Sequence, residues 1–211
     1  LQTTDTLTGG AGTEDTFILT ADGTDMTSAD LDTVTLFENV DLEFDGDISI
    51  ISDTLMIATG GSMTWTASGQ TTGQVTLNVS DETDTTSSQT ISMGGTGGHI
   101  VTLGSGTDSY TYTYSGTGTH GVQNVTATAG TNTITTLDAA DIITLGSGVD
   151  TVNTGAGNDT INTATANLVS TDTIDGGTGT DTLTFSDATA TATVVDADFT
   201  NIDNVETVTL N

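Results

Sequence analysis

Residues 145–162 read LGSGVDTVNTGAGNDTIN, in which a carboxylate and an apolar residue recur together every nine positions. Asp150 and Asp159 each follow a glycine-rich turn, and an apolar residue, Val152 or Ile161, stands two places after each. Glycine with Asp favours turns, whereas Thr and β-branched apolar residues favour strands. A regular alternation of turn and short strand predicts stacked repeats that bury their apolar residues against one another. The two glycine turns are Gly146-Ser147-Gly148 and Gly155-Ala156-Gly157.

The nine-residue phase extends in both directions from this stretch. The positions that continue it are Gln123, Asn132, Asp141, Asp172 and Asp181, and Gly177 and Gly179 supply the turn before the last of them. The pattern breaks at residues 163–170, where the spacing is nine plus four, so a four-residue bulge would restore the phase. We therefore predict one continuous roll from Gln123 to Phe185.

Shorter copies of the pattern lie upstream. Gly94–Val101 carries His99 in the position of the acid, and the next unit carries Asp108. A copy near the start has one extra residue, so its acid is either Glu14 or Asp15. Residues 46–92 instead show strict apolar alternation, which predicts half-buried strands. The only candidates for helical turns are 26–31 and 195–201.

A longer repeat relates the two ends of the sequence. Residues 4–10 resemble 171–177, and residues 37–41 resemble 202–206. With the shorter copies, this divides the chain into five segments. We predict a partial repeat module at 1–45, a β-strand segment at 46–92, a short repeat piece at 93–119, a roll at 120–186 and a closing β module at 187–211.

The charge composition excludes several classes of partner. The chain has no Lys or Arg and 29 acidic residues, which gives a formal net charge of −29. Nothing can neutralise phosphates, so binding to nucleic acid or to anionic lipid is excluded. The carboxylates must be solvated, protonated or bound to cations. The chain has no Cys for a disulfide and no stretch that resembles a membrane span.

These motifs resemble the repeats-in-toxin (RTX) family of secreted calcium-binding repeats. The nonapeptide pattern G-G-x-G-x-D-x-U-x, with U apolar, matches best over Ala140–Asn162 and Gly176–Thr184. The Thr-rich, Lys-free composition and the segment Phe199–Val208 resemble bacterial surface-layer proteins and large adhesins. The resemblance implies an all-β fold, a parallel β-roll or β-solenoid with Gly-rich turns, and additional strand segments.

The resemblance also implies calcium as the bound ion. Two nonapeptides would form one coil, and turn carbonyls and Asp carboxylates of neighbouring coils would supply the oxygens that Ca²⁺ requires. One edge would carry Gln123, Asp141, Asp159 and Asp181, and the other Asn132, Asp150 and Asp172. The predicted metal-binding residues are Asp108, Asn132, Asp141, Asp150, Asp159, Asp172, Asp181, Gly146, Gly148, Gly155, Gly157, Gly177 and Gly179. Asp172 lacks its own glycine turn, which predicts a weaker site.

Other residues have alternative interpretations. His99 and His120 have too few convergent partners for a transition-metal site and are interpreted as polar turn residues. Trp65 and the tyrosines at 110, 112 and 114 could form a sugar platform, but a packed strand face is favoured. Outward Thr-x-Thr pairs, such as Thr133 with Thr135 or Thr182 with Thr184, occur in ice-binding solenoids, although a solvated face is the commoner meaning. No catalytic constellation stands out.

We therefore expect a non-enzymatic, calcium-stabilised extracellular protein of a bacterial surface layer or surface filament that binds copies of itself. The alternative is a calcium-dependent adhesin stalk or ligand-binding module, with a cell-surface polysaccharide as a candidate partner. An ice-binding solenoid or a polysaccharide-acting β-helix enzyme is disfavoured.

Overall fold

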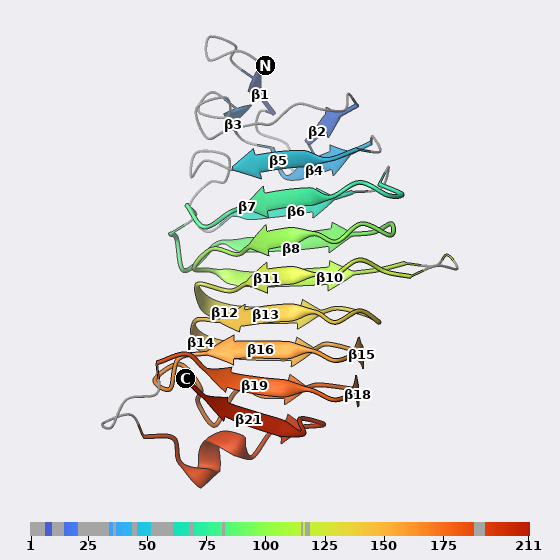
Figure 1. Ribbon diagram of the computed structural model, residues 1–211. Helices are drawn as coiled ribbons and strands as arrows, with labels where there is room; N and C mark the ends of the chain where they lie inside the picture. Colours follow the sequence, from blue (N-terminus) through green and yellow to red (C-terminus); the bar gives the residue numbers. More distant parts are fainter. Residues whose placement is uncertain are drawn as a thin grey trace.

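The computed structural model describes residues 7–9, 15–20, 34–35, 37–43, 46–51, 61–67, 70–81, 83–114, 116, 119–187 and 193–211. This part of the chain forms a β-solenoid of about seven turns, stacked in chain order from the N-terminal strands to the C-terminal ones (Figure 1). The predicted all-β parallel solenoid is confirmed. Among the described residues, no helix has the length and apolarity needed to cross a membrane.

Two parallel sheets form opposite faces of the solenoid. The nine-stranded sheet consists of β2 (Thr16–Leu19), β4 (Asn39–Leu42), β6 (Ser62–Thr66), β8 (Ser88–Met93), β10 (Thr107–Tyr112), β12 (Ala129–Thr135), β14 (Ser147–Asn153), β17 (Thr173–Asp175) and β20 (Ile202–Asp203). The eight-stranded sheet consists of β5 (Ile48–Ile51), β7 (Val75–Asn78), β9 (Ile100–Thr102), β11 (Asn124–Thr126), β13 (Ile142–Leu145), β16 (Thr160–Thr163), β19 (Thr182–Phe185) and β21 (Thr207–Leu210).

Smaller elements lie at the margins. A two-stranded sheet joins β1 (Leu7–Thr8) to β3 (Val34–Thr35), and a second joins β15 (Ala156–Gly157) to β18 (Thr178–Gly179) within the glycine turns. The 3₁₀ helix η1 (Asp196–Phe199) lies within the predicted helical stretch 195–201, and its Phe199 ring lies 6.4 Å from that of Phe185. The other helix candidate, 26–31, and Glu14 lie outside the described residues.

The apolar residues of the repeat face inward and stack. Ile143, Val152, Ile161, Ile174 and Leu183 are all buried, as the nine-residue phase predicts. In strands, successive side chains point to opposite faces, so every inward apolar residue is flanked by outward ones. The result is a continuous core built coil upon coil.

The core continues through the strands upstream of the roll, and Trp65, Tyr110 and Tyr112 are buried in it. These three rings cannot present a sugar platform, because less than 2 % of each side chain is accessible. Only Tyr114 remains partly exposed. The packed strand face that the sequence favoured for these aromatics is what the structure contains.

The break at residues 163–170 is accommodated without a change of register. Thr151 pairs with Thr173 across β14 and β17, so Asp172 follows Asp150 one coil later. Leu168, in the extra segment, turns inward and is buried. The four added residues therefore lengthen one coil, and both sheets run through the boundaries between the predicted segments.

Candidate calcium sites

One edge of the solenoid stacks the side chains of the repeat's acid position above one another. We call this column the first edge; its members are His99, Gln123, Asp141, Asp159, Asp181 and Glu206. Each carboxylate accepts a hydrogen bond from the backbone of the preceding member. The N–H groups of Gln123, Asp141 and Asp159 each donate over 2.7 Å to the Oδ1 of the next aspartate along the column. The predicted pairing of Asp141 with Asp159 and of Asp159 with Asp181 thus describes neighbours in space.

The second oxygen of each of these aspartates has no protein partner. Oδ2 of Asp141, of Asp159 and of Asp181 is buried and accepts no hydrogen bond. A buried carboxylate oxygen without a partner is costly unless a proton or a cation reaches it. No Lys or Arg exists to supply that charge. Three successive coils therefore present a column of oxygen atoms that needs cations.

The pKa values reflect this shortage of partners. Burial raises the pKa of Asp141 to about 6, although the hydrogen bond from the Gln123 backbone acts in the opposite direction. Burial also raises the pKa of Asp159, against the hydrogen bond from the Asp141 backbone. The negative charge of the next aspartate in the column raises each of them further. In the absence of a cation these carboxyl groups keep their proton to a higher pH than a solvated Asp does.

The glycine turns bring backbone carbonyls against the next coil. Gly177 and Gly179 lie directly over the carbonyl oxygens of Gly155 and Gly157, and a Cβ at either upper position would collide with them. Both upper glycines also have positive φ, 80° and 148°, which L side chains rarely adopt. Glycine is therefore required here by space and by conformation. The turns supply carbonyl oxygens beside the carboxylates of Asp159 and Asp181.

The opposite edge holds a second column, which we call the second edge. Its members are Gln89, Asp108, Asn132, Asp150 and Asp172. Asp108 pairs with Asn132, and Asn132 with Asp150, across β10, β12 and β14. The Asn132 amide donates to Oδ1 of Asp150 over 2.8 Å, while its own Oδ1 is buried without a partner. Burial raises the pKa of Asp150 to about 6, with the Asn132 hydrogen bond opposing.

Asp172 differs from the other aspartates in its hydrogen bonding. Its Oδ1 accepts from the Asp150 N–H and its Oδ2 from the Val169 N–H, each over 2.9 Å. Both oxygens are therefore occupied by protein donors, which supports the weaker site that its missing glycine turn predicts. At the other end of this edge, Asp108 accepts from the Gln89 N–H over 2.9 Å.

The donor set fits a hard cation bound by oxygen. Among the described residues, no group of three or more His, Cys, Asp or Glu side chains converges. An ion between two coils would therefore take at most two carboxylates and complete its shell with turn carbonyls and water. Such a shell suits Ca²⁺, which takes six to eight oxygens in flexible geometry. Asp159 and Asp181, with glycine turns before both, provide the most complete set.

The structure also adds two glutamates that the nine-residue pattern missed. Glu206 accepts the Asp181 N–H over 2.7 Å, and Glu38 accepts the Asp15 N–H over 2.9 Å. Asp15 therefore occupies the place in its coil that Asp181 occupies in the last one, and its Oδ2 is likewise buried without a partner. The similarity of residues 37–41 to 202–206 was the available signal, since no glycine turn precedes either glutamate.

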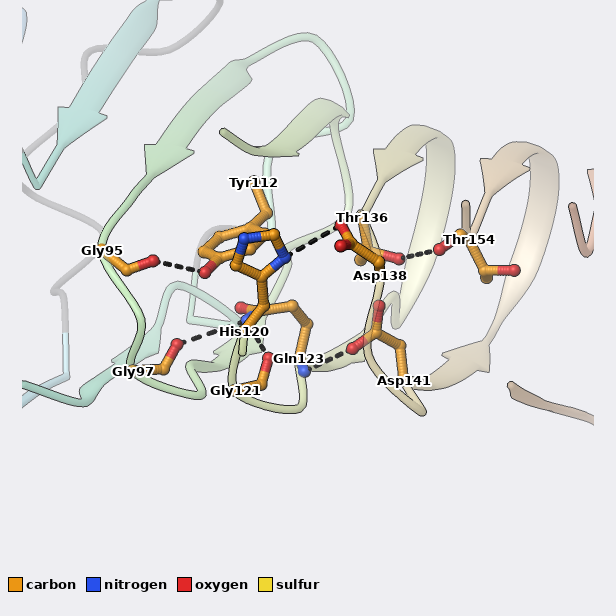
Figure 2. Close-up of polar contacts among 10 residues, drawn as sticks. All are labelled: Gly95, Gly97, Tyr112, His120, Gly121, Gln123, Thr136, Asp138, Asp141 and Thr154. Atoms are coloured by element: carbon orange, nitrogen blue, oxygen red, sulfur yellow. Dashed lines mark hydrogen bonds and ion pairs between the residues drawn. The ribbon is translucent and has the colours of Figure 1, made fainter. Parts of the chain in front are cut away.

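The two histidines serve the coils as polar side chains. His99 lies in the first edge, where its Nδ1 accepts from the Val75 N–H over 3.0 Å and its Nε2 contacts the Gly94 carbonyl over 2.9 Å. His120 lies one turn away, with its Nδ1 2.9 Å from Oδ1 of Asp138 (Figure 2). Figure 2 also shows Gln123 bridging from the carbonyls of Gly97 and Gly121 to Asp141.

Comparison with known proteins gives one match. Residues 126–161 and 170–185 match the RTX calcium-binding nonapeptide repeat in four copies. These residues contain Asn132, Asp141, Asp150, Asp159 and Asp181, together with the glycine turns described above. No curated protein and no solved structure matches the chain. RTX nonapeptide repeats bind calcium ions, and this part of the chain carries such repeats.

Proposed function

We propose that this protein is a calcium-stabilised extracellular structural protein of a bacterial surface layer or surface filament. The observation that carries the proposal is the column of paired, buried aspartates in a chain without Lys or Arg. RTX repeat proteins are typically secreted and their repeats typically non-catalytic, which favours a structural role over an enzymatic one.

The residues supply an ionic mechanism for folding after export. Without cations, Asp141, Asp159 and Asp181 would each bury a negative oxygen, and a net charge of −29 opposes compaction. The acidic chain would therefore remain expanded where calcium is scarce. Bound calcium neutralises the two edges and links the turns of adjacent coils. The coils would then close outside the cell, where extracellular modules bind calcium with Kd of about 10⁻⁴–10⁻³ M.

Self-association would complete a structural role. Among the described residues β21 pairs with one strand, β19. Val208 and Leu210 continue the inward-facing row of Leu183 and Phe185 but are exposed to 50 % and 67 % at this end of the described solenoid. An unpaired strand edge with exposed apolar side chains can accept another strand. We propose a second copy of the chain as the partner. In the alternative, an adhesin stalk, the solenoid would stay monomeric and present a surface to a cell-surface polysaccharide.

Electron microscopy of the purified protein at millimolar calcium distinguishes the two roles. Ordered sheets or filaments that dissolve in chelator support the surface-layer role. Monodisperse rods at high protein concentration contradict it and favour the adhesin stalk. Circular dichroism of the same samples separates assembly from folding. A β signal that depends on calcium in a sample without particles would mean that calcium folds the chain but does not assemble it.

A further inference from the structure

The outward face of the nine-stranded sheet carries a regular array of hydroxyl groups. Parallel pairing places the outward residues of successive strands in one rank, Thr64, Thr90, Ser109, Thr133, Thr151 and Thr173. A second rank, two residues further along each strand, includes Ser92, Thr111 and Thr135. We call these two ranks the hydroxyl face. It repeats in two dimensions over the central coils.

The hydroxyl groups of this face are available to an external ligand. Within the described chain, the side chains of Thr90, Ser109 and Thr133 take part in no hydrogen bond, and Thr90 and Thr133 are exposed. The first rank also contains no acidic residue, although the chain has 29 of them. Asp108 and Asp150, on the same strands, point inward and are buried. Over the central coils the face is therefore neutral in a strongly acidic protein.

The chemistry of the hydroxyl face limits the ligand. The first rank carries no charge, and the second carries carboxylates only beyond the central coils, at Asp41 and Asp175. Ions and charged polymers are therefore disfavoured over the central coils. The aromatic side chains of these strands, Trp65, Tyr110 and Tyr112, are buried, so the face offers no ring on which a sugar could stack. The face offers a grid of hydroxyl groups. Most of them belong to Thr, so a methyl group stands beside the hydroxyl on the same side chain. Such a grid fits a neutral, periodic partner made of hydrogen-bonding groups.

The spacing of the grid fits crystalline water. Strands lie ~4.7–4.9 Å apart, and residues two apart along a strand lie ~6.6–6.8 Å apart. Water oxygens joined by hydrogen bonds of about 2.75 Å at the tetrahedral angle place second neighbours at about 4.5 Å, and the lattice repeats at about 7.3 Å in the perpendicular direction. Each spacing agrees to within roughly a tenth. Several coils can therefore stay in step with one ice plane.

We propose that the hydroxyl face binds ice. The strands of successive central coils lie nearly parallel to one another (Figure 1), which would keep the ranks close to straight over these strands. Each Thr would place its methyl against the lattice and its hydroxyl in a lattice position. The agreement of spacing is close but imperfect, so we expect inhibition of ice recrystallisation more than a large depression of freezing. This activity does not depend on the surface-layer role.

The eight-stranded sheet provides an internal control. Its first outward rank interrupts the Thr residues with Ile100, Asn124 and Ile142. Its second rank carries Thr102, Thr126 and Thr144 in register and is then interrupted by Asn162, so this sheet offers a single short row of hydroxyls and no two-dimensional array. Thr144 lies on this opposite face, in register with Thr126 and Asn162. A bulky residue at Thr144 would therefore leave the hydroxyl face intact while making the same chemical change as at Thr133.

The test is ice recrystallisation in a sucrose film containing millimolar calcium, with the full chain, Thr133→Tyr, Thr90→Tyr and Thr144→Tyr. Tyrosine is a good strand residue, and circular dichroism checks that the fold is kept. We expect the unchanged chain and Thr144→Tyr to keep ice grains small, while Thr133→Tyr and Thr90→Tyr need a several-fold higher concentration for the same effect.

Grain growth in the unchanged chain equal to that with serum albumin would overturn the proposal, as would equal loss of activity in all three variants. Binding to crystalline cellulose without any effect on ice would replace water by a polysaccharide as the ligand.

Discussion

The coils of His99 and Gln123 and those of Asp141, Asp159 and Asp181 fill the same position of the first edge in two different ways. In the two upstream coils of this set the position holds a neutral side chain whose polar atoms are hydrogen-bonded. Gln123 accepts from the Tyr110 hydroxyl over 2.6 Å and donates to the Gly121 carbonyl over 2.7 Å, and His99 bonds through both ring nitrogens. In the downstream coils a carboxylate leaves one buried oxygen unpartnered.

The comparison shows that one architecture can be closed by hydrogen bonds or by ions. We call the coils of His99 and Gln123 the neutral coils and those of Asp141, Asp159 and Asp181 the acidic coils. The neutral coils are also longer: 24 residues separate Val75 from His99 and His99 from Gln123, against 18 between Gln123 and Asp141. Dependence on calcium should therefore vary along the solenoid.

Removal of calcium should have the largest effect, and it should destabilise the acidic coils more than the neutral coils. In chelator we expect amide protons of the acidic coils, residues 141–185, to lose protection from hydrogen exchange. Those of the neutral coils, residues 89–126, should keep most of theirs, because their edge is closed by protein hydrogen bonds. Exchange measured by mass spectrometry on peptic fragments reports both regions in one experiment. Uniform loss along the chain, or no loss at all, would contradict the division.

The next test exchanges the two ways of closing the edge. Gln123→Glu places a carboxylate oxygen where the amide now donates to Gly121, and burying an unpaired charge costs about 3 kcal/mol. The loss in free energy of unfolding should be greater in chelator than in calcium, because the new carboxylate lies next to Asp141 in the column.

Asp141→Asn is the matched reverse change, since it removes a buried charge while keeping the side chain's shape. It should raise the stability of the calcium-free protein and weaken calcium binding. Urea unfolding of the two variants with and without calcium measures both effects. If Gln123→Glu were as stable as the unchanged chain in chelator, the neutral coils would not depend on their hydrogen bonds.

A smaller difference in calcium affinity should distinguish the aspartates by the number of inter-coil sites to which each contributes. Asp159 lies between Asp141 and Asp181, so Asp159→Ala removes a ligand from two inter-coil sites at once. We expect calcium affinity to fall roughly tenfold or more, as the loss of a charged hydrogen-bonding group is worth on the order of 1.5–3 kcal/mol. Asp108→Ala, whose neighbours are Gln89 and Asn132, should cost less. Equal losses in a calorimetric calcium titration would refute this register.

The acidic coils could be predicted from sequence to a greater extent than the neutral ones. The nine-residue phase placed Asp141, Asp159 and Asp181 in one column. This was possible because the turns and strands of that region have constant lengths, apart from the four residues added at 163–170. The contact of Gln123 with Tyr110 could not be predicted, since it joins a core side chain of β10 to the first edge and no repeat spacing relates the two positions. Glu206 follows Asp181 by 25 residues without a glycine turn, so its position depends on a loop whose length the repeat does not set.

The effect of pH should be the smallest and should have opposite signs in the two regions. Asp141 and Asp150 have pKa values of about 6 in the folded chain, above the ~3.9 of an unfolded Asp. Without calcium their contribution to stability is fully present below pH ~4 and is lost as pH rises through 6, because the folded state then gives up protons it had retained.

Burial lowers the pKa of His99 below the usual ~6.5. Its neutral form therefore stabilises the fold above pH ~6.5, and that contribution is lost as pH falls.

In chelator, protection factors of the acidic coils should therefore rise between pH 7 and pH 5, while those around His99 should fall. In calcium the trend of the acidic coils should reverse, because protons compete with the ion for the same carboxylates. The Asp141→Asn and Asp150→Asn double variant serves as the control, since its acidic coils should show a smaller change with pH in chelator, with Asp159 as the remaining buried carboxyl group of raised pKa. A rise or fall of the same sign in both regions would show that the net charge of the whole chain, rather than these particular buried groups, governs the response to pH.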